Sequence, residues 1–135
     1  MKKSIVLIHE DKRELEIFKK ALTEIKGDFT CDYAPNAEEA MKLLQAQKAD
    51  FIFTDYHQSV QGLQLLAVVK AHPRLRSIKA FIYSENINED VEKMARTLGA
   101  SGCIEKPGTL SRLIHQFRAI FAGDLMSDYA FLPRI

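Results

Sequence analysis

Asp55 is the residue whose type and position could best carry chemistry in this sequence, because it closes the apolar run Phe-Ile-Phe-Thr at 51–54. Ser84 and Lys106 close two later runs in the same way. An Asp after a strand often only begins a turn, since its side chain bonds to nearby backbone groups. A carboxylate, a hydroxyl and an ammonium at matching strand ends instead suit phosphoryl transfer. In this interpretation Asp55 is the nucleophile, and Ser84 and Lys106 hold phosphoryl oxygens.

The first apolar run, 5–8, ends in three further polar residues, His9, Glu10 and Asp11. Clustered carboxylates repel one another unless a hard cation neutralises them, and oxygen ligands of this kind suit Mg²⁺. We therefore expect Glu10, Asp11 and Asp55 at a Mg²⁺ site, with Glu10 favoured over Asp11 as the direct ligand. His9 leaves two alternatives: it could admit a softer cation such as Mn²⁺ or Zn²⁺, or it could bond a carboxylate or water at the rim. We favour the second.

The elements that must position these residues alternate along the chain. Apolar and β-branched runs predict strands at 5–8, 29–34, 51–55, 79–84 and 103–106. Apolar residues at helical spacing predict helices at about 15–25, 36–44, 62–72, 88–98 and 110–121. Five strands alternating with five helices through short connections predict an α/β fold with a doubly wound, five-stranded parallel sheet. The carboxyl ends of parallel strands share one edge, so the polar residues above should meet there.

Helix boundaries and buried faces can also be predicted. Asn36 and Asn88 are the expected N-caps of two helices, and Glu39 is the expected capping-box partner of Asn36. Periodicity places Met94 on the buried face of the fourth helix and Leu110 on that of the fifth.

Length and composition exclude several classes of function. A chain of 135 residues is expected to form one domain. A net charge of +1, with positive and negative residues interspersed, gives no basic patch of the kind that binds nucleic acid. The apolar run after Met1 is too short for a secretory signal and no stretch could span a membrane. We therefore expect a cytoplasmic protein, with Cys31 and Cys103 as reduced thiols.

The motifs together resemble the receiver domain of response regulators in two-component signalling, over residues 3 to about 122. The resemblance is carried by segments 5–11, 51–55, 81–84 and 99–107. It implies a flavodoxin-like fold, Mg²⁺-dependent transfer of phosphate to Asp55 from a histidine kinase or phosphotransfer protein, and later hydrolysis. It also implies that the backbone carbonyl of His57 binds the metal and that the Lys106–Pro107 bond is cis. Such a domain is a signalling module rather than an enzyme, and its output passes through a downstream protein.

Several positions depart from the receiver pattern. The loop after Asp55 lacks the usual proline, and Glu85 follows Ser84 where the family has a small residue. Cys103 occupies the position of the aromatic residue that reports movement of the switch hydroxyl. Together with His9, these departures leave an alternative open: a degenerate pseudo-receiver that acts as a constitutive protein-interaction module.

Residues 123–135 follow the last predicted helix and are too short to form an output domain. They are too apolar to form a solvated tail, so we expect them to pack on the receiver domain, 1–122, or less readily across a homodimer. By resemblance, the fourth helix, fifth strand and fifth helix form the expected partner surface.

Overall fold

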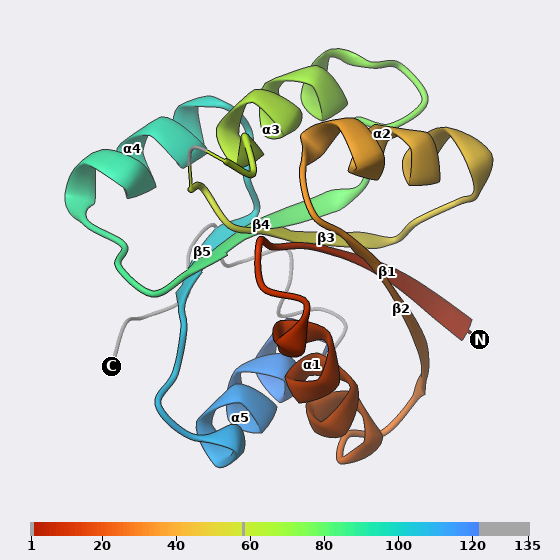
Figure 1. Cartoon of the computed structure of the whole chain (residues 1–135), viewed down its shortest axis with the longest axis vertical. Coiled ribbons are helices and arrows are strands. Elements are labelled where there is room, and N and C mark those ends of the chain that lie inside the picture. The colour runs from red at the N-terminus through yellow and green to blue at the C-terminus, as the bar shows by residue number, and fades with distance from the viewer. Residues whose placement is uncertain (1, 58, 122–135) are drawn as a thin grey trace.

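The sheet is parallel throughout, as the alternation of strands and helices predicts. In the computed structural model, which describes residues 2–57 and 59–121, five strands lie in the order β2-β1-β3-β4-β5 (Figure 1). They are β1 (Lys2–Ile8), β2 (Asp28–Ala34), β3 (Phe51–Thr54), β4 (Lys79–Ser84) and β5 (Gly102–Glu105). This order reverses direction between β1 and β3, which is the place where open α/β sheets form a ligand crevice. The predicted doubly wound fold is confirmed.

Five helices of the described chain cover the two faces of this sheet. They are α1 (Arg13–Thr23), α2 (Ala37–Ala46), α3 (Gly62–Ala71), α4 (Glu89–Thr97) and α5 (Leu110–Ile120). Helices α1 and α5 lie on one face, and α2, α3 and α4 lie on the other (Figure 1). None of the helices within 2–57 and 59–121 is long and apolar enough to cross a bilayer.

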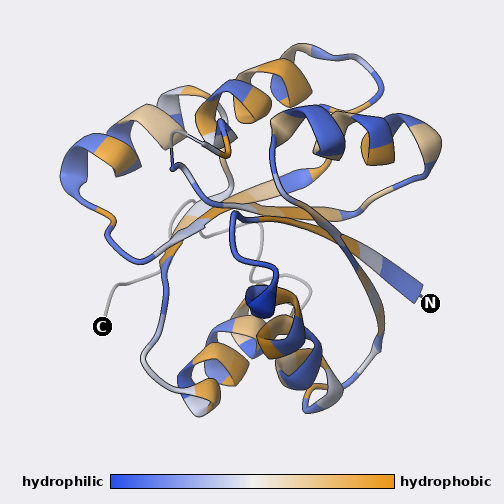
Figure 2. Ribbon diagram, in the orientation of Figure 1, coloured by the Kyte–Doolittle hydropathy of each residue, from blue (hydrophilic) through white to orange (hydrophobic). Residues whose placement is uncertain are grey.

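Strand alternation divides the buried side chains between the two faces. On β1, Ile5 and Leu7 pack toward α1 and α5, and Val6 and Ile8 pack toward the other three helices. Figure 2 shows the resulting apolar stretches along the strands and the inner sides of the helices. These strands are buried on both faces, so they read in the sequence as continuous apolar runs.

The core under α1 and α5 is rich in aromatic rings. Phe18 meets Phe53, Tyr83 and Phe117 edge-on, with ring centroids 5.3, 4.9 and 5.0 Å away. Edge-to-face pairs of this kind contribute about 0.5–1.5 kcal/mol each beyond the area that they bury. This packing fixes α1 and β4 against each other below the edge where the polar residues gather.

The predicted N-caps are confirmed. The side chain of Asn36 accepts a hydrogen bond from the Glu39 amide at 2.9 Å, and that of Asn88 accepts one from the Val91 amide at 2.9 Å. The reciprocal half of the capping box does not form, because the Glu39 carboxylate pairs with Lys42 instead.

Two residues predicted to face inward are exposed. Met94 on α4 is 52% exposed and Leu110 at the start of α5 is 40% exposed. On α4 only Ala95 is fully buried, so the helix contacts the core through a narrow stripe that Met94 misses. Leu110 occupies the first position of α5, whose buried residues begin only at Leu113. Periodicity gives the direction of a face but not its width.

Candidate functional site

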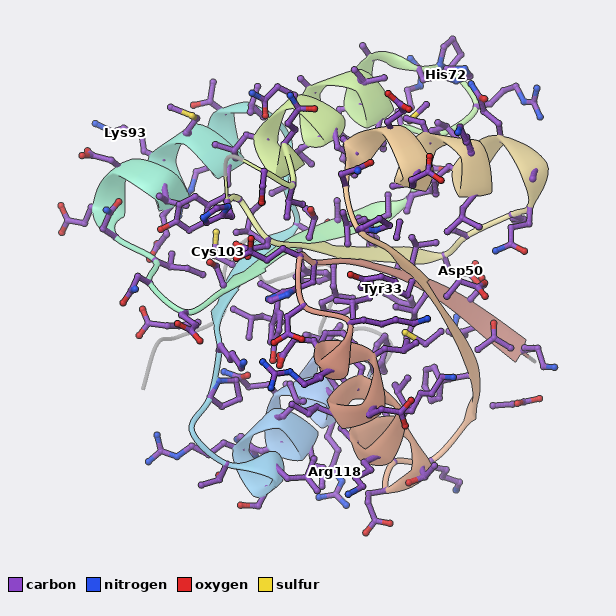
Figure 3. The ribbon with its side chains drawn as sticks, in the orientation of Figure 1. Tyr33, Asp50, His72, Lys93, Cys103 and Arg118 are labelled. Carbon is purple, nitrogen blue, oxygen red and sulfur yellow. The ribbon has the colours of Figure 1, made fainter. Side chains whose placement is uncertain are left out.

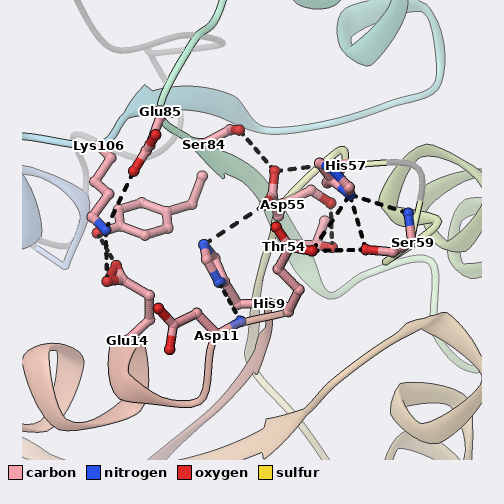
Figure 4. A network of polar contacts seen from close by, with 12 residues as sticks. His9, Asp11, Glu14, Thr54, Asp55, His57, Ser59, Ser84, Glu85 and Lys106 are labelled. Atoms are coloured by element: carbon pink, nitrogen blue, oxygen red, sulfur yellow. Dashed lines mark hydrogen bonds and ion pairs between the residues drawn. The ribbon is translucent and has the colours of Figure 1, made fainter.

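The predicted site residues converge at the carboxyl edge of the sheet around one hollow. Figure 4 shows the polar network there. The hollow has a volume of about 270 Å³. Its lining residues come from the ends of β1, β3, β4 and β5: His9, Glu10, Asp11, Asp55, Tyr56, His57, Ser84, Glu85, Asn86 and Lys106. All the residues that the sequence analysis assigned to catalysis or metal binding therefore line the same hollow.

Asp55 lies at the floor of this hollow and is only 7% exposed. Its amide donates to the carbonyl of Ile8 at 3.0 Å, which ties the end of β3 to β1. Its Oδ1 accepts hydrogen bonds from the Ser84 hydroxyl at 2.7 Å and from the His57 amide at 3.2 Å. The carboxylate is thus oriented by donors from both the end of β4 and the loop after β3.

The start of α3 holds the backbone of Asp55 in place. A Cβ atom on Gly62 would lie 1.8 Å from the Asp55 carbonyl oxygen, so no larger residue fits there without moving the helix. The preceding residue, Gln61, is left-handed with φ of 59°, which turns the chain into α3. The loop after Asp55, which lacks the usual receiver proline, thus ends at Gly62 in close contact with the Asp55 backbone.

His9 faces the other oxygen of the Asp55 carboxylate. Its Nε2 lies 3.7 Å from Asp55 Oδ2, and the ring is buried. Its Nδ1 accepts a hydrogen bond from the Asp11 amide at 3.0 Å, so in the neutral ring the proton is assigned to Nε2. His9 therefore presents a donor to Asp55, which agrees with the favoured alternative in which this histidine contacts a carboxylate.

The two acids after β1 are both engaged away from Asp55. Asp11 forms a bidentate salt bridge with Arg13, in which Arg13 Nη2 lies 2.8 Å from Asp11 Oδ2 and Arg13 Nε lies 3.0 Å from Asp11 Oδ1. These Arg13 hydrogen bonds lower the pKa of Asp11 to about 2. Glu10 accepts a hydrogen bond from the Ser59 hydroxyl at 3.0 Å, and its Oε2 lies 3.6 Å from His57 Nδ1.

As they lie, these residues do not fit a metal ion. Within 2–57 and 59–121, no three His, Cys, Asp or Glu side chains are close enough together to hold one. The His57 carbonyl, implied as a ligand by the resemblance, accepts amides from Val60 at 2.9 Å and Gln61 at 3.1 Å instead. The metal site stays a prediction, and it requires Glu10 or Asp11 to leave its present partner.

Lys106 is directed away from Asp55. Its ammonium lies 2.8 Å from Glu14 Oε2 and 3.9 Å from Glu85 Oε1, and in the described chain it forms no ion pair with Asp55 (Figure 4). Its amide donates to the Ser84 carbonyl at 2.7 Å, so only the side chain is turned away. The Lys106–Pro107 bond is not cis, because residues 2–57 and 59–121 contain no cis peptide bond. That implication of the resemblance is wrong here, and trans is the form that X-Pro bonds ordinarily favour.

Glu14 is the residue of this region that the sequence analysis missed. It lies on α1, its side chain is only 3% exposed, and it accepts a hydrogen bond from the Tyr83 hydroxyl at 3.1 Å. Burial, followed by the charge of Glu14, raises the pKa of Tyr83. A signal was available: Glu14 precedes Phe18 by four residues, so helical spacing places it on the buried face of α1.

Cys103 and Tyr83 lie on opposite faces of the sheet, because Cys103 pairs with Ile82 and alternation along β4 turns Tyr83 to the other face. Cys103 is buried on β5 among residues that pack under α2, α3 and α4 (Figure 3). Neither Cys31 nor Cys103 is joined in a disulfide. The loop after Ser84 is joined to the loop after Asp55, because the Tyr56 hydroxyl donates to the Asn86 carbonyl.

Comparison with known proteins agrees with this geometry. The family model "Response regulator receiver domain" matches residues 5–118. The probable C4-dicarboxylate response regulator DctR of Bacillus subtilis (strain 168) is 29% identical over 112 residues, which cover 81% of this chain and 48% of DctR. The chain thus spans about half the length of that relative. The chemotaxis protein CheY of Pseudomonas aeruginosa is 25% identical over 118 residues, covering 87% of this chain and 94% of CheY.

The fold is also that of known response regulators. The crystal structure of the Mn(2+)-bound form of response regulator Rcp1 superposes with a TM-score of 0.76 at 22% identity, covering 91% of this chain and 94% of Rcp1. Its likeness supports the flavodoxin-like receiver fold. With the family model matching most of the chain, this protein belongs to the response regulator receiver domain family of two-component signalling.

Proposed function

We propose that this chain is a phosphoacceptor receiver module, in which Asp55 takes a phosphoryl group from a histidine kinase or phosphotransfer protein. The observation that carries the proposal is the buried Asp55 carboxylate, which opens into the polar hollow with the Ser84 hydroxyl 2.7 Å from its Oδ1. A carboxylate held by fixed donors beside an open space is arranged to attack an incoming group.

The proposed step can be written with acetyl phosphate as the donor. A carboxylate oxygen of Asp55 attacks phosphorus, the new phosphorus–oxygen bond forms, and the bond from phosphorus to the acetyl oxygen breaks. Acetate leaves with the bonding electron pair, so charge balances and no proton moves. The Ser84 hydroxyl and the His57 amide, which now bond to Asp55 Oδ1, are placed to donate to phosphoryl oxygens.

A divalent cation could take part only after Glu10 or Asp11 leaves its present partner. When bound, Mg²⁺ or Mn²⁺ would neutralise phosphoryl charge, and Asp55 with Glu10 or Asp11 would hold it. Rcp1 has been crystallised in a Mn²⁺-bound form. Glu10 and Asp11 are engaged elsewhere here, and the transfer from acetyl phosphate to Asp55 balances without the cation.

We further propose that the module acts in the cytoplasm, has no enzymatic activity beyond taking up and losing phosphate, and signals by binding a downstream protein. It is not expected to bind nucleic acid or membrane. Residues 122–135, which include the proposed C-terminal extension 123–135 after domain 1–122, lie outside the described residues. Their packing on the domain or across a homodimer stays a prediction.

A second function is favoured by specific observations. Lys106 is paired with Glu14 and not with Asp55, and His9 stands where receivers carry an acid. Such a site could belong to a pseudo-receiver that binds its partner constitutively.

Phosphoryl uptake separates the two functions. The protein is incubated with acetyl phosphate, with Mg²⁺, with Mn²⁺ and with EDTA, and its intact mass is measured. The phosphoacceptor proposal expects an added phosphoryl mass that Asp55→Asn abolishes. Asp90→Asn, an exposed acid on α4, is the matched control and should retain uptake. No added mass under any of the three conditions would favour the pseudo-receiver.

A further inference from the structure

The most unexpected acid in this structure is Glu14, which is buried beneath the site and takes the cation that the receiver pattern assigns to the phosphoryl group. We propose that Glu14 is a positioning residue that holds the Lys106 ammonium away from Asp55, so that phosphoryl uptake requires this ion pair to open. The inference rests on the proposed function, since it concerns the rate of the same reaction.

Glu14 cannot follow Lys106 toward Asp55. Its carboxylate is anchored on α1 by the Tyr83 hydroxyl, 3.1 Å from Oε1. Tyr83 is 1% exposed and packs edge-on against Phe18 at 4.9 Å between ring centroids. The acid is therefore held by a packed aromatic residue, and any rearrangement of the pair must come from the lysine.

Lys106 has the freedom that this rearrangement needs. Its backbone is fixed beside Ser84 by the 2.7 Å bond from its amide to the Ser84 carbonyl. Its side chain is 27% exposed and consists of a flexible four-carbon stem. The ammonium can thus change partners without moving β5.

Before phosphorylation each carboxylate is satisfied separately. Asp55 has the Ser84 hydroxyl, the His57 amide and the His9 ring as neighbours. Glu14 is buried and would keep only the Tyr83 hydroxyl if Lys106 left, and an unpaired buried carboxylate is unfavourable. Lys106 therefore favours Glu14 until the phosphoryl group of the donor brings additional negative charge next to Asp55.

Glu85 is a weaker competitor for the same lysine. Its carboxylate is 3.9 Å from the Lys106 ammonium and its side chain is 74% exposed, so solvent screens the pair. Glu14 is therefore the acid that holds Lys106.

The first test compares initial rates of phosphoryl uptake from acetyl phosphate for wild type, Glu14→Gln and Glu16→Gln. Gln keeps the oxygen that accepts from Tyr83 but has no charge to hold Lys106. Glu16 lies on the same helix and is exposed, so it is the matched control. We expect Glu14→Gln to raise the rate at least about 5-fold, the upper limit for an exposed ion pair, because this pair is buried on the Glu14 side. Glu16→Gln should leave the rate unchanged.

The second test does not depend on phosphate. Lysines are reductively methylated with formaldehyde and dimethylamine–borane, and the modification of Lys106 is measured by peptide mapping against the exposed Lys19 and Lys20. Release from Glu14 should make Lys106 react faster in Glu14→Gln and not in Glu16→Gln. Thermal melting of each variant establishes that it is folded before either test.

Each outcome decides the inference. A folded Glu14→Gln protein whose uptake rate is unchanged or lower overturns it, as does unchanged methylation of Lys106. If methylation rises but neither wild type nor Glu14→Gln takes up phosphate, the proposed function fails and Glu14 retains only the structural part of its role. A rise in both readouts, confined to Glu14→Gln, supports the inference.

Discussion

Replacing Lys106 by Met should destabilise the fold far more than replacing its partner, Glu14, by Gln. Met retains the apolar stem of the lysine and removes the charge, which leaves the buried Glu14 carboxylate with the Tyr83 hydroxyl as its hydrogen-bond donor. Gln at position 14 instead removes the buried charge and leaves Lys106, which reaches solvent.

The magnitudes follow from the exposure of the two side chains. Breaking a fully buried pair by removing one partner costs about 3–5 kcal/mol. Glu14 is 3% exposed but Lys106 is 27% exposed, so water can enter from the lysine side. We therefore expect Lys106→Met to lower the free energy of unfolding by about 2–3 kcal/mol, and Glu14→Gln by about 1 kcal/mol or less. The double variant should resemble Glu14→Gln, because it contains no unpaired charge.

Urea unfolding followed by far-ultraviolet circular dichroism measures these differences. Lys42→Met is the control, because the Lys42–Glu39 pair has the same type of contact at 2.9 Å but is exposed on both sides, at 67% and 44%. It should leave the free energy of unfolding nearly unchanged, because solvent screens this pair. Equal effects of Lys106→Met and Glu14→Gln, or no coupling between them in the double-mutant cycle, would refute this account of the buried pair.

Two further predictions concern the surroundings of Asp55. Gly62→Ala should lower the free energy of unfolding by about 2–3 kcal/mol, because the new Cβ would lie 1.8 Å from the Asp55 carbonyl oxygen. Gly108→Ala is the control: its Cβ meets open space, so it should be near neutral in the same urea assay. Asp11 should titrate near 2 by carboxyl NMR, and Arg13→Ala should return the pKa toward 3.8. Since the pKa of Asp11 is lower in the folded state, its stabilising contribution is present above the unfolded pKa and is lost as the pH falls toward 2. A wild-type Asp11 that titrates near 3.8 would contradict the Arg13 contact.

The sequence was sufficient to predict the fold and to bring the polar residues at the strand ends to one edge of the sheet. Apolar runs such as 51–54 and helical spacing such as that of Leu15 and Phe18 are local patterns, and burial on both faces of a parallel sheet imposes them directly. Parallel topology then brings the strand ends to one edge, whatever the loops do. This is why Asp55, Ser84 and Lys106 could all be placed around one hollow.

The partners of the polar side chains could not be predicted in the same way. Strand position fixes where the Lys106 backbone lies, but its long side chain pairs with Glu14, a buried acid on α1 that is distant in the sequence. Asp11 likewise turns to Arg13, two residues along, rather than to the hollow. Which of the charges within its reach a long side chain pairs with depends on the folded surroundings and not on the local sequence.

The site of phosphoryl attachment is the most direct test of the proposed function. Protein treated with acetyl phosphate is digested and mapped by mass spectrometry, with Asp55→Asn digested in parallel. The account predicts the added phosphoryl group on the peptide that contains Asp55, and none in the variant. A phosphoryl group on another peptide, or an unmodified Asp55 peptide in wild type under every divalent cation tested, would contradict it.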